Sequence, residues 1–187
     1  MHTITCILKA LRLPFQFDTT RILKELAQFS QEDYYDIYNP SVTLETLWSK
    51  QFIEPHRQED EQIVFQPNQA LQACPYLLSI YDQFECDKET FRVHTLEAGA
   101  SIKAHRDIGY RLEDGKVRLH IPVQTHADVA ILLEGEEVTM GPGECWYCNF
   151  HITHEVHNRS DQHRIHLIID CLVNPWLESL FETAQTS

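Results

Sequence analysis

The stretch "KAHRDIGYRL" places His105 and Asp107 two positions apart. In an extended segment, residues i and i+2 project to the same side, so both side chains can reach one cation. A histidine and a carboxylate are two parts of the facial triad that holds non-haem Fe(II) and leaves coordination positions open. Taken alone, the pair also fits a solvated turn. The metal interpretation therefore needs a third ligand from elsewhere in the chain.

The stretch "HITHEVHN" offers three histidines as that ligand: His151, His154 and His157. It reads as part of a short strand, and the strand register decides which imidazole faces the cation. The residues alone leave the three open. We favour His154 as the ligand; with a different strand register, His151 or His157 would take its place.

Arginine and histidine alternate on two further predicted strands. Arg118 and His120 lie in "VRLHI", and Arg164 opens "RIHLIID" ten residues after His154. An arginine is seldom buried without an anionic partner, so an inward-facing Arg164 would imply a bound carboxylate or an internal salt bridge. Two arginines and a histidine aimed into a barrel that also holds a metal would form a pocket for a small dianion.

The order of these motifs resembles a known family. An H-x-D pair, R-x-H on the following strand, "GE-x-W-Y" leading to a distal histidine, and arginine ten residues on within "R-x-H-L-I-x-D" follow one another from about Thr90 to Asp170. This order is similar to that of the aspartyl/asparaginyl β-hydroxylase family of Fe(II)/2-oxoglutarate-dependent dioxygenases. The animal enzymes of the family have glycine at the position of Asp107, so the likeness is to the bacterial proline-hydroxylase-like branch.

The resemblance implies a site and an activity. His105, Asp107 and His154 would be the iron ligands, Arg164 would pair with the distal carboxylate of 2-oxoglutarate, and Arg118 and His120 match positions that contact this cosubstrate in some relatives. A planar guanidinium suits a bidentate carboxylate.

The implied activity is an O2-dependent dioxygenase that hydroxylates an unactivated C–H bond of an amino acid or of an Asp-, Asn- or Pro-type residue. Its substrate would be a small molecule or a peptide. The alternative is a cupin-like metal-binding protein or isomerase without oxygenase activity. Asn149 departs from the aspartate common in relatives, and we expect it to affect strand packing more than chemistry.

Short segments rich in β-branched and aromatic residues must position these side chains. Seven such segments follow Thr90, separated by turn sequences such as "LEDGK" and "GPGE", and predict a mainly β protein with a double-stranded β-helix (jelly-roll, cupin-like) core over residues 90–174. Amphipathic spacing predicts helices over residues 19–29, after Asp18 as N-cap, and from Pro75 to Phe84. Residues 1–89 form a helical and irregular part packing on the core, within a single domain 1–187. Gln31 to Gln69 reads as loop-rich, with a short possible helix from Leu44 to Lys50.

Composition narrows the function classes. A net charge of -13 over 187 residues repels phosphate backbones, so nucleic acid is not an expected partner. No apolar run approaches a membrane span and we see no export signal, so we expect a cytoplasmic protein with reduced cysteines. The sequence does not predict an oligomeric state.

Several residues with metal-binding or anion-binding chemistry have ordinary interpretations. Cys145 and Cys148 are three apart on a predicted strand, so they should point to opposite faces as packing residues. Arg106 and Arg111, beside the H-x-D pair, are either solvated or partners of a substrate carboxylate, and we favour solvated for each. The remaining histidines of the second half receive no role as ligands: His94, His126, His163 and His166, the last of which can line the pocket.

Overall fold

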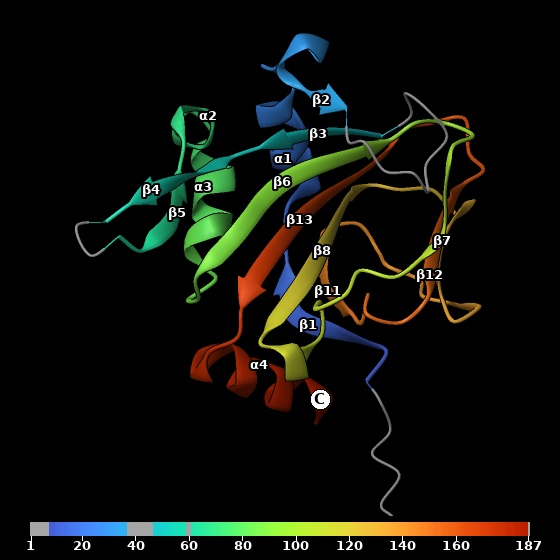
Figure 1. The fold of residues 1–187 in the computed structure, drawn as a ribbon. Coiled ribbons are helices and arrows are strands. Elements are labelled where there is room, and N and C mark those ends of the chain that lie inside the picture. The colour runs from blue at the N-terminus through green and yellow to red at the C-terminus, as the bar shows by residue number, and fades with distance from the viewer. Residues whose placement is uncertain (1–7, 37–46, 59–60, 187) are drawn as a thin grey trace, which may run out of the picture.

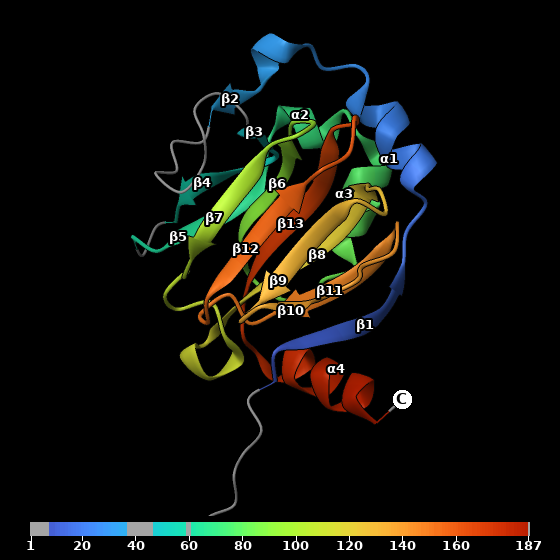
Figure 2. The same ribbon diagram turned by 90° about the vertical axis from the view of Figure 1, so that its right-hand side faces the viewer.

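Two antiparallel sheets face each other and form the jelly roll expected from the sequence (Figures 1 and 2). The computed structural model describes residues 8–36, 47–58 and 61–186. The major sheet has the order β1 (Ala10–Gln16), β11 (Glu144–Cys148), β8 (Lys116–Gln124), β13 (Arg164–Leu172), β6 (Lys88–Leu96), β3 (Leu47–Gln51) and β2 (Tyr35–Asp36). The minor sheet has the order β10 (Glu136–Glu137), β9 (Val129–Leu133), β12 (His154–Asn158) and β7 (Ser101–His105).

The helices lie outside this sandwich. A separate hairpin pairs β4 with β5. The bounds of these remaining elements are α1 Thr19–Leu26, η1 Gln31–Asp33, β4 Ile53–Arg57, β5 Ile63–Pro67, α2 Gln69–Gln72, α3 Pro75–Asp82, η2 Leu112–Asp114 and α4 Pro175–Gln185. None of the helices in the described ranges is long and apolar enough to cross a membrane.

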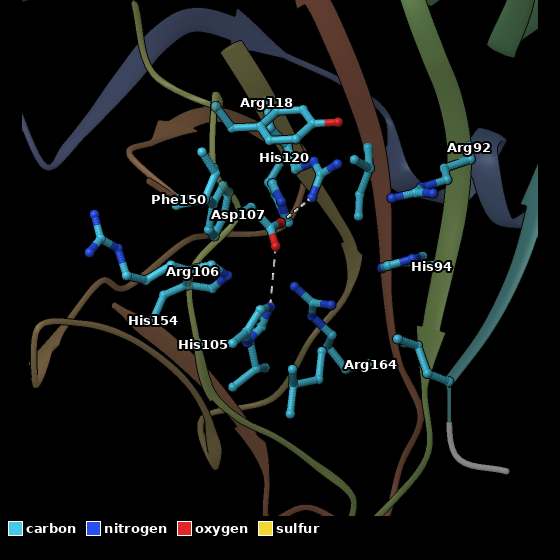
Figure 3. A pocket seen from close by; sticks show the side chains of 16 residues that line it. Arg92, His94, His105, Arg106, Asp107, Arg118, His120, Phe150, His154 and Arg164 are labelled. Carbon is cyan, nitrogen blue, oxygen red and sulfur yellow. Dashed lines mark hydrogen bonds and ion pairs between the residues drawn. The ribbon is translucent and has the colours of Figure 1, made fainter. Parts of the chain in front are cut away.

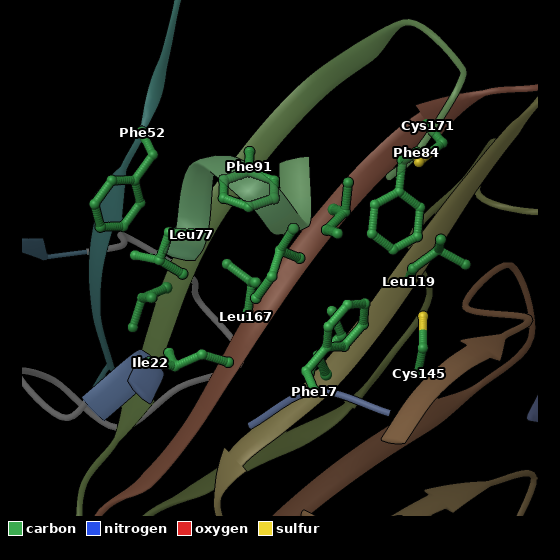
Figure 4. Packing of buried hydrophobic residues seen from close by; sticks show 14 of the residues in the cluster. Phe17, Ile22, Phe52, Leu77, Phe84, Phe91, Leu119, Cys145, Leu167 and Cys171 are labelled. Carbon is green, nitrogen blue, oxygen red and sulfur yellow. The ribbon is translucent and has the colours of Figure 1, made fainter. Parts of the chain in front are cut away.

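The larger hydrophobic core lies between the outer face of the major sheet and the helices (Figure 4). Phe91, Leu119 and Leu167, from the three central strands, are fully buried there with Ile22 of α1 and Leu77 of α3. Complete burial of a side chain of this size stabilises a fold by about 1.5–3 kcal/mol. This core therefore holds the central strands rigid, which leaves their opposite face free to carry polar groups.

A smaller core fills part of the space between the sheets. Its buried residues include Leu96 of β6, Ile131 of β9 and Val156 of β12. Cys145 lies in the outer core and Cys148 in this inner one, so the two cysteines do point to opposite faces of β11 as packing residues. Burial raises the pKa of both thiols. All five cysteines in the described ranges are free thiols, and Cys6 lies outside them.

Both helices expected from the first ninety residues are present. Asp18 caps α1 by accepting a hydrogen bond from the backbone N–H of Arg21 at 3.1 Å, and α1 ends at Leu26, one turn earlier than expected. Pro75 occupies the first turn of α3, where a missing N–H costs no helical hydrogen bond.

The loop-rich interpretation of Gln31 to Gln69 is wrong where β3, β4 and β5 lie. The short helix expected from Leu44 to Lys50 is also wrong from Leu47 onward, because Leu47–Gln51 forms β3; its first residues, 44–46, lie outside the described ranges. The edge strand β1 and the outer strand β3 add to a sheet whose centre comes from the second half of the chain. Such pairing is non-local, so the pattern within each segment does not indicate it. The division at residue 89 stays a prediction.

Candidate metal centre and anion pocket

His105, Asp107 and His154 converge at one end of the space between the sheets (Figure 3). Each offers one ligand atom, and these atoms lie within 4.8 Å of one another, the sole cluster of three potential metal ligands in the described part of the chain. His105 ends β7 and His154 begins β12, where the two are register partners with ring centroids 4.2 Å apart. Two antiparallel strands and the loop after β7 therefore supply two imidazoles and a carboxylate on one side of a single cavity.

The backbone around the three residues orients their side chains. Nδ1 of His105 lies 2.8 Å from the carbonyl oxygen of Lys103, and Nδ1 of His154 lies 3.1 Å from that of Ile152. A backbone carbonyl on one ring nitrogen fixes the tautomer and leaves the other nitrogen, here Nε2, with its lone pair for a metal. Burial lowers the pKa of His154, which favours the neutral imidazole that metals bind.

Three hydrogen bonds join the two segments that carry the ligands. The N–H of Asp107 donates to the carbonyl of Phe150 at 2.9 Å, and Nε of Arg106 donates to the carbonyl of His151 at 2.7 Å. The N–H of Gly109 donates to Nδ1 of His151 at 3.3 Å. These bonds hold the H-x-D loop against the loop that leads to His154.

The two alternative histidines are engaged elsewhere. Nδ1 of His151 lies 3.2 Å from a carboxylate oxygen of Asp114, and Nε2 of His157 lies 3.1 Å from one of Glu155. Neither belongs to the cluster with His105 and Asp107.

Three neighbouring strands of the major sheet carry the same R-x-H pattern, and five of the six side chains lie around the cavity in Figure 3; the sixth, His166, contacts Arg164. From the sequence we expect roles for Arg118, His120 and Arg164 and treat His94 and His166 as ordinary histidines, of which His166 can line the pocket; the sequence reading does not single out Arg92. The repeated R-x-H pattern could have indicated that these side chains lie together, since alternate residues of adjacent strands share one face of a sheet. The pairs are Arg92 and His94 on β6, Arg118 and His120 on β8, and Arg164 and His166 on β13.

Arg118 pairs with two carboxylates. Its Nε and Nη2 donate to the two oxygens of Asp170 at 2.7 and 2.9 Å, and its Nη1 donates to Oδ2 of Asp107 at 2.5 Å. Burial opposes the charged form, but the attraction of Asp170 and then Asp107 outweighs it, so the pKa of Arg118 is raised. Its guanidinium carbon lies 4.1 Å from the centre of the Tyr110 ring. Arg118 thus occupies one oxygen of the candidate ligand Asp107 and leaves the other facing His105.

Arg164 has no carboxylate partner among the described residues. It is 2% exposed, its Nη2 lies 2.8 Å from Nδ1 of His166, and its Nε makes no hydrogen bond. Burial lowers the pKa of this guanidinium to about 9. Burying a charge without a counterion is costly, so this position is suited to a carboxylate brought by a ligand.

The cavity gathers every buried side-chain N or O atom that lacks a hydrogen-bond partner within the described ranges. These atoms are Nε of Arg92, Nε2 of His94, Nε2 of His120 and Nε of Arg164. All four residues line the same cavity of about 400 Å³, together with the three candidate metal ligands. Buried polar groups are normally paired, so four unpaired polar atoms in one cavity indicate a polar ligand.

The pocket histidines stay neutral. Burial, and then the neighbouring arginines, lower the pKa values of His94, His120 and His166 well below the ordinary value. The charge of the pocket is therefore carried by its four arginines, Arg92, Arg118 and Arg164 on the major sheet and Arg106 beside the ligand Asp107, and by Asp107 and Asp170.

This donor set fits a divalent iron and a dicarboxylate. Two imidazoles and one carboxylate form the set that holds non-haem Fe(II). Arg164 supplies a guanidinium for a carboxylate, and Ile102, Phe150 and Val156 give the cavity an apolar wall.

The sequence interpretations of three other residues can be compared with their contacts. Arg111 lies beside Asp114, with Nε 2.8 Å from its carboxylate. Arg106 lines the cavity mouth. Asn149 is buried, and its Oδ1 accepts a hydrogen bond from the N–H of His151 at 3.2 Å, a contact within the turn that leads to His154.

Comparisons with known proteins agree with this geometry. The chain is 24% identical over 179 residues to L-proline cis-4-hydroxylase of Rhizobium meliloti (strain 1021), an alignment that covers 91% of this chain and 63% of that protein. The chain thus spans less than two thirds of the length of this curated relative.

Solved structures share the fold. An oxidoreductase of the 2OG-Fe(II) oxygenase family from Burkholderia pseudomallei matches with a TM-score of 0.57 at 13% identity, covering 88% of this chain and 84% of that one. The non-heme monooxygenase ThoJ in its nickel complex matches with a TM-score of 0.53 at 13% identity, covering 88% and 74% of the two chains. The family model described as aspartyl/asparaginyl beta-hydroxylase matches residues 16–174. The chain therefore belongs to the aspartyl/asparaginyl β-hydroxylase family.

Proposed function

We propose that this protein is an Fe(II)- and 2-oxoglutarate-dependent dioxygenase that hydroxylates an amino acid or an amino-acid residue. The observation that carries the proposal is that three metal ligands and an unpaired buried guanidinium, Arg164, line one cavity. The family and the proline hydroxylase relative support the reaction class.

The residues have distinct roles in this proposal. His105, Asp107 and His154 would hold the iron, and Arg164 would pair with the distal carboxylate of 2-oxoglutarate. Iron with 2-oxoglutarate and O2 supplies the oxidant for C–H hydroxylation, with succinate and CO2 as co-products. His120, which lines the same cavity, would contact the cosubstrate. Arg118 would act through Asp107, as a positioning residue for a metal ligand.

An anaerobic titration tests the proposal. Addition of 2-oxoglutarate to the Fe(II) protein should produce the metal-to-ligand charge-transfer absorption, and admission of O2 with a panel of amino acids and peptides should then produce succinate and a product heavier by one oxygen atom. His105→Ala should abolish metal binding and the absorption. Tightly bound zinc or nickel, with no succinate formed under iron, would instead favour the cupin-like alternative.

A cosubstrate lacking the distal carboxylate tests the role of Arg164. The unmodified protein should bind 2-oxoglutarate more tightly than 2-oxobutyrate by about 10- to 100-fold, the range of a charge-assisted hydrogen bond. Arg164→Met should lose this preference, whereas Arg12→Met, at an exposed arginine beside Glu144 on another surface, should keep it. Retention of the preference in Arg164→Met would mean that another group binds the distal carboxylate.

A further inference from the structure

Two of the cysteines lie together at one end of the major sheet. Cys171, near the end of β13, pairs in register with Lys88 at the start of β6, and Cys86 precedes Lys88 by two residues (Figure 1). Cys171 belongs to the outer hydrophobic core and Cys86 packs against it, so the pair lies on the face of the sheet opposite to the metal cavity (Figure 4). Both are free thiols, and the S–H of Cys171 donates a hydrogen bond to the sulfur of Cys86.

Hydrogen bonds hold the segment around Cys86 against the end of β13. The N–H of Leu172 donates to the carbonyl of Asp87 at 2.8 Å, and Nδ2 of Asn174 donates to the carbonyl of Glu85 at 2.8 Å. These two contacts lie on either side of Cys86 in the sequence. The backbone thus already brings the two thiols together, as bridging by a disulfide requires.

The two thiols differ in their access to solvent and in their acidity. Cys86 is half-buried and lines a cavity of about 470 Å³, whereas Cys171 is fully buried. The hydrogen bond from Cys171 lowers the pKa of Cys86, and this effect outweighs the opposing effect of burial. The same hydrogen bond, and then burial, raise the pKa of Cys171. Cys86 is therefore the thiol that ionises first and that a small reagent can reach.

Lys88 places a positive charge beside the pair. Its side chain is buried, and its Nζ donates hydrogen bonds to the carbonyls of Phe84 and Cys86 at 2.6 and 2.7 Å. The ammonium group also lies 4.3 Å from the centre of the Tyr81 ring. A neighbouring ammonium group stabilises a thiolate, and here its effect on Cys86 is larger than the opposing effect of the Asp87 carboxylate.

The other cysteines within the described ranges have a different environment. Cys74, Cys145 and Cys148 are fully buried, and burial raises the pKa of each. Buried thiols in apolar surroundings are unreactive. An accessible, acidic thiol beside a buried second thiol is instead the arrangement of cysteines that sense oxidants.

We propose that Cys86 and Cys171 form a redox-active dithiol, which a hydroperoxide converts into a reversible disulfide. The Cys86 thiolate attacks one peroxide oxygen, the O–O bond breaks, and the leaving oxygen takes up a proton and departs as water or an alcohol, which leaves a sulfenic acid on Cys86. The sulfur of Cys171 then attacks the sulfur of Cys86, the S–O bond breaks, and the hydroxyl group departs as water with the proton of the Cys171 thiol.

The two thiols together lose two electrons and two protons, and the peroxide is reduced. A dithiol reductant restores both thiols by thiol–disulfide exchange. The pair lies outside the metal cavity, so this inference does not depend on the proposed function.

The test uses the unmodified chain, with iron removed by a chelator so that the peroxide does not react with the metal. The reduced protein is treated with a small excess of hydrogen peroxide, its remaining thiols are blocked with N-ethylmaleimide, and its peptides are identified by mass spectrometry. A disulfide between Cys86 and Cys171 should form and should disappear with dithiothreitol. Before oxidation, iodoacetamide should modify Cys86 more than about tenfold faster than Cys145 or Cys148.

Variants then assign the two steps. Cys171→Ala should stop at the sulfenic acid on Cys86, which dimedone traps, and Cys86→Ser should leave Cys171 unmodified. Cys6→Ser, at the cysteine outside the described ranges, is the matched control and should form the disulfide like the unmodified chain. Because Cys171 belongs to the core, Cys86→Ser and the unmodified chain carry the test if the alanine variant fails to fold.

Three results would overturn the inference: iodoacetamide modifies Cys86 no faster than the buried cysteines, peroxide forms no disulfide between Cys86 and Cys171, or Cys171 is oxidised equally well in Cys86→Ser. The charge-transfer absorption of the Fe(II) protein is measured separately, so these results leave the proposed function standing.

Discussion

Replacing Asp170 with asparagine tests whether Arg118 positions a metal ligand. Asp170 is 2% exposed and accepts two hydrogen bonds from Arg118, which donates a third to Asp107. Asparagine keeps the shape of the side chain and one acceptor oxygen but removes the negative charge. Arg118 then has Asp107 as its remaining carboxylate, so it should draw that carboxylate away from the metal.

The expected magnitude follows from burial. Breaking a buried ion pair by removing one partner costs about 3–5 kcal/mol. Since Asp107 still compensates Arg118, we expect the lower end, about 3 kcal/mol in the free energy of unfolding. For a chain of this size that corresponds to a fall of about 6–12 °C in Tm. Metal affinity should fall by about 10- to 100-fold, the effect typical of groups that orient a metal ligand.

Two measurements separate stability from positioning. Urea unfolding of the metal-free protein gives the free energy, and a competitive chelator titration gives the metal affinity. The double variant Arg118→Met/Asp170→Leu replaces the pair with apolar groups and should recover much of the stability, because such replacements are often neutral. It should not recover the metal affinity, since Asp107 has lost its anchor. A destabilisation of Asp170→Asn below about 1 kcal/mol, the value of an exposed pair, would refute the reasoning.

Three further predictions concern the ligand, the pH dependence and a turn. His154→Gln should lower metal affinity by more than about 100-fold, whereas His157→Gln, whose ring contacts Glu155, should change it by less than about tenfold in the same chelator titration. Burial lowers the pKa of His94 in the folded protein, whereas the unfolded chain takes up a proton there near pH 6.5, so the free energy of unfolding of the metal-free protein should fall as the pH drops below that value. In urea unfolding, His94→Gln should reduce the change of this free energy with pH by up to about 1.4 kcal/mol per pH unit. An unchanged pH dependence would contradict the burial of a neutral ring. Gly143 has φ +77°, and a Cβ there would lie 2.2 Å from the carbonyl oxygen of Phe17. Gly143→Ala should therefore lower the stability of the protein more than Gly99→Ala, which meets the left-handed penalty of about 1–2 kcal/mol without a clash. Equal falls in Tm for the two variants would refute this account.

The candidate ligands could be predicted because the chemistry restricts both residue type and order. An H-x-D pair on an extended segment and a distal histidine before an arginine-bearing strand are local patterns, and the structure brings His105, Asp107 and His154 together. The choice among the three distal histidines depended on strand register, which the resemblance supplied and the residues alone did not.

The arginines of the pocket and their partners were less predictable than the candidate metal ligands. Whether Arg118 contacts a ligand or a carboxylate depends on Asp170, its register partner on β13 from 52 residues away. Such a pairing is invisible within either segment. Arg92 could not be singled out from its own segment, because one R-x-H on a strand is common. Only the sheet order places three such pairs on neighbouring strands. The edge strand β1 was missed for the same reason, because it pairs with β11 far along the chain.

The alternation of arginine with fully buried apolar residues on β6, β8 and β13 also bears on how the chain selects its fold. On β6, Phe91 and Val93 face the outer core while Arg92 faces the cavity. A one-residue slip in strand pairing would exchange these faces and carry a guanidinium into hydrocarbon. Misaligned sheets would thus be penalised most heavily at the positions that prepare the pocket, so assembly of the correct β-sheet and preservation of the site are enforced by the same side chains.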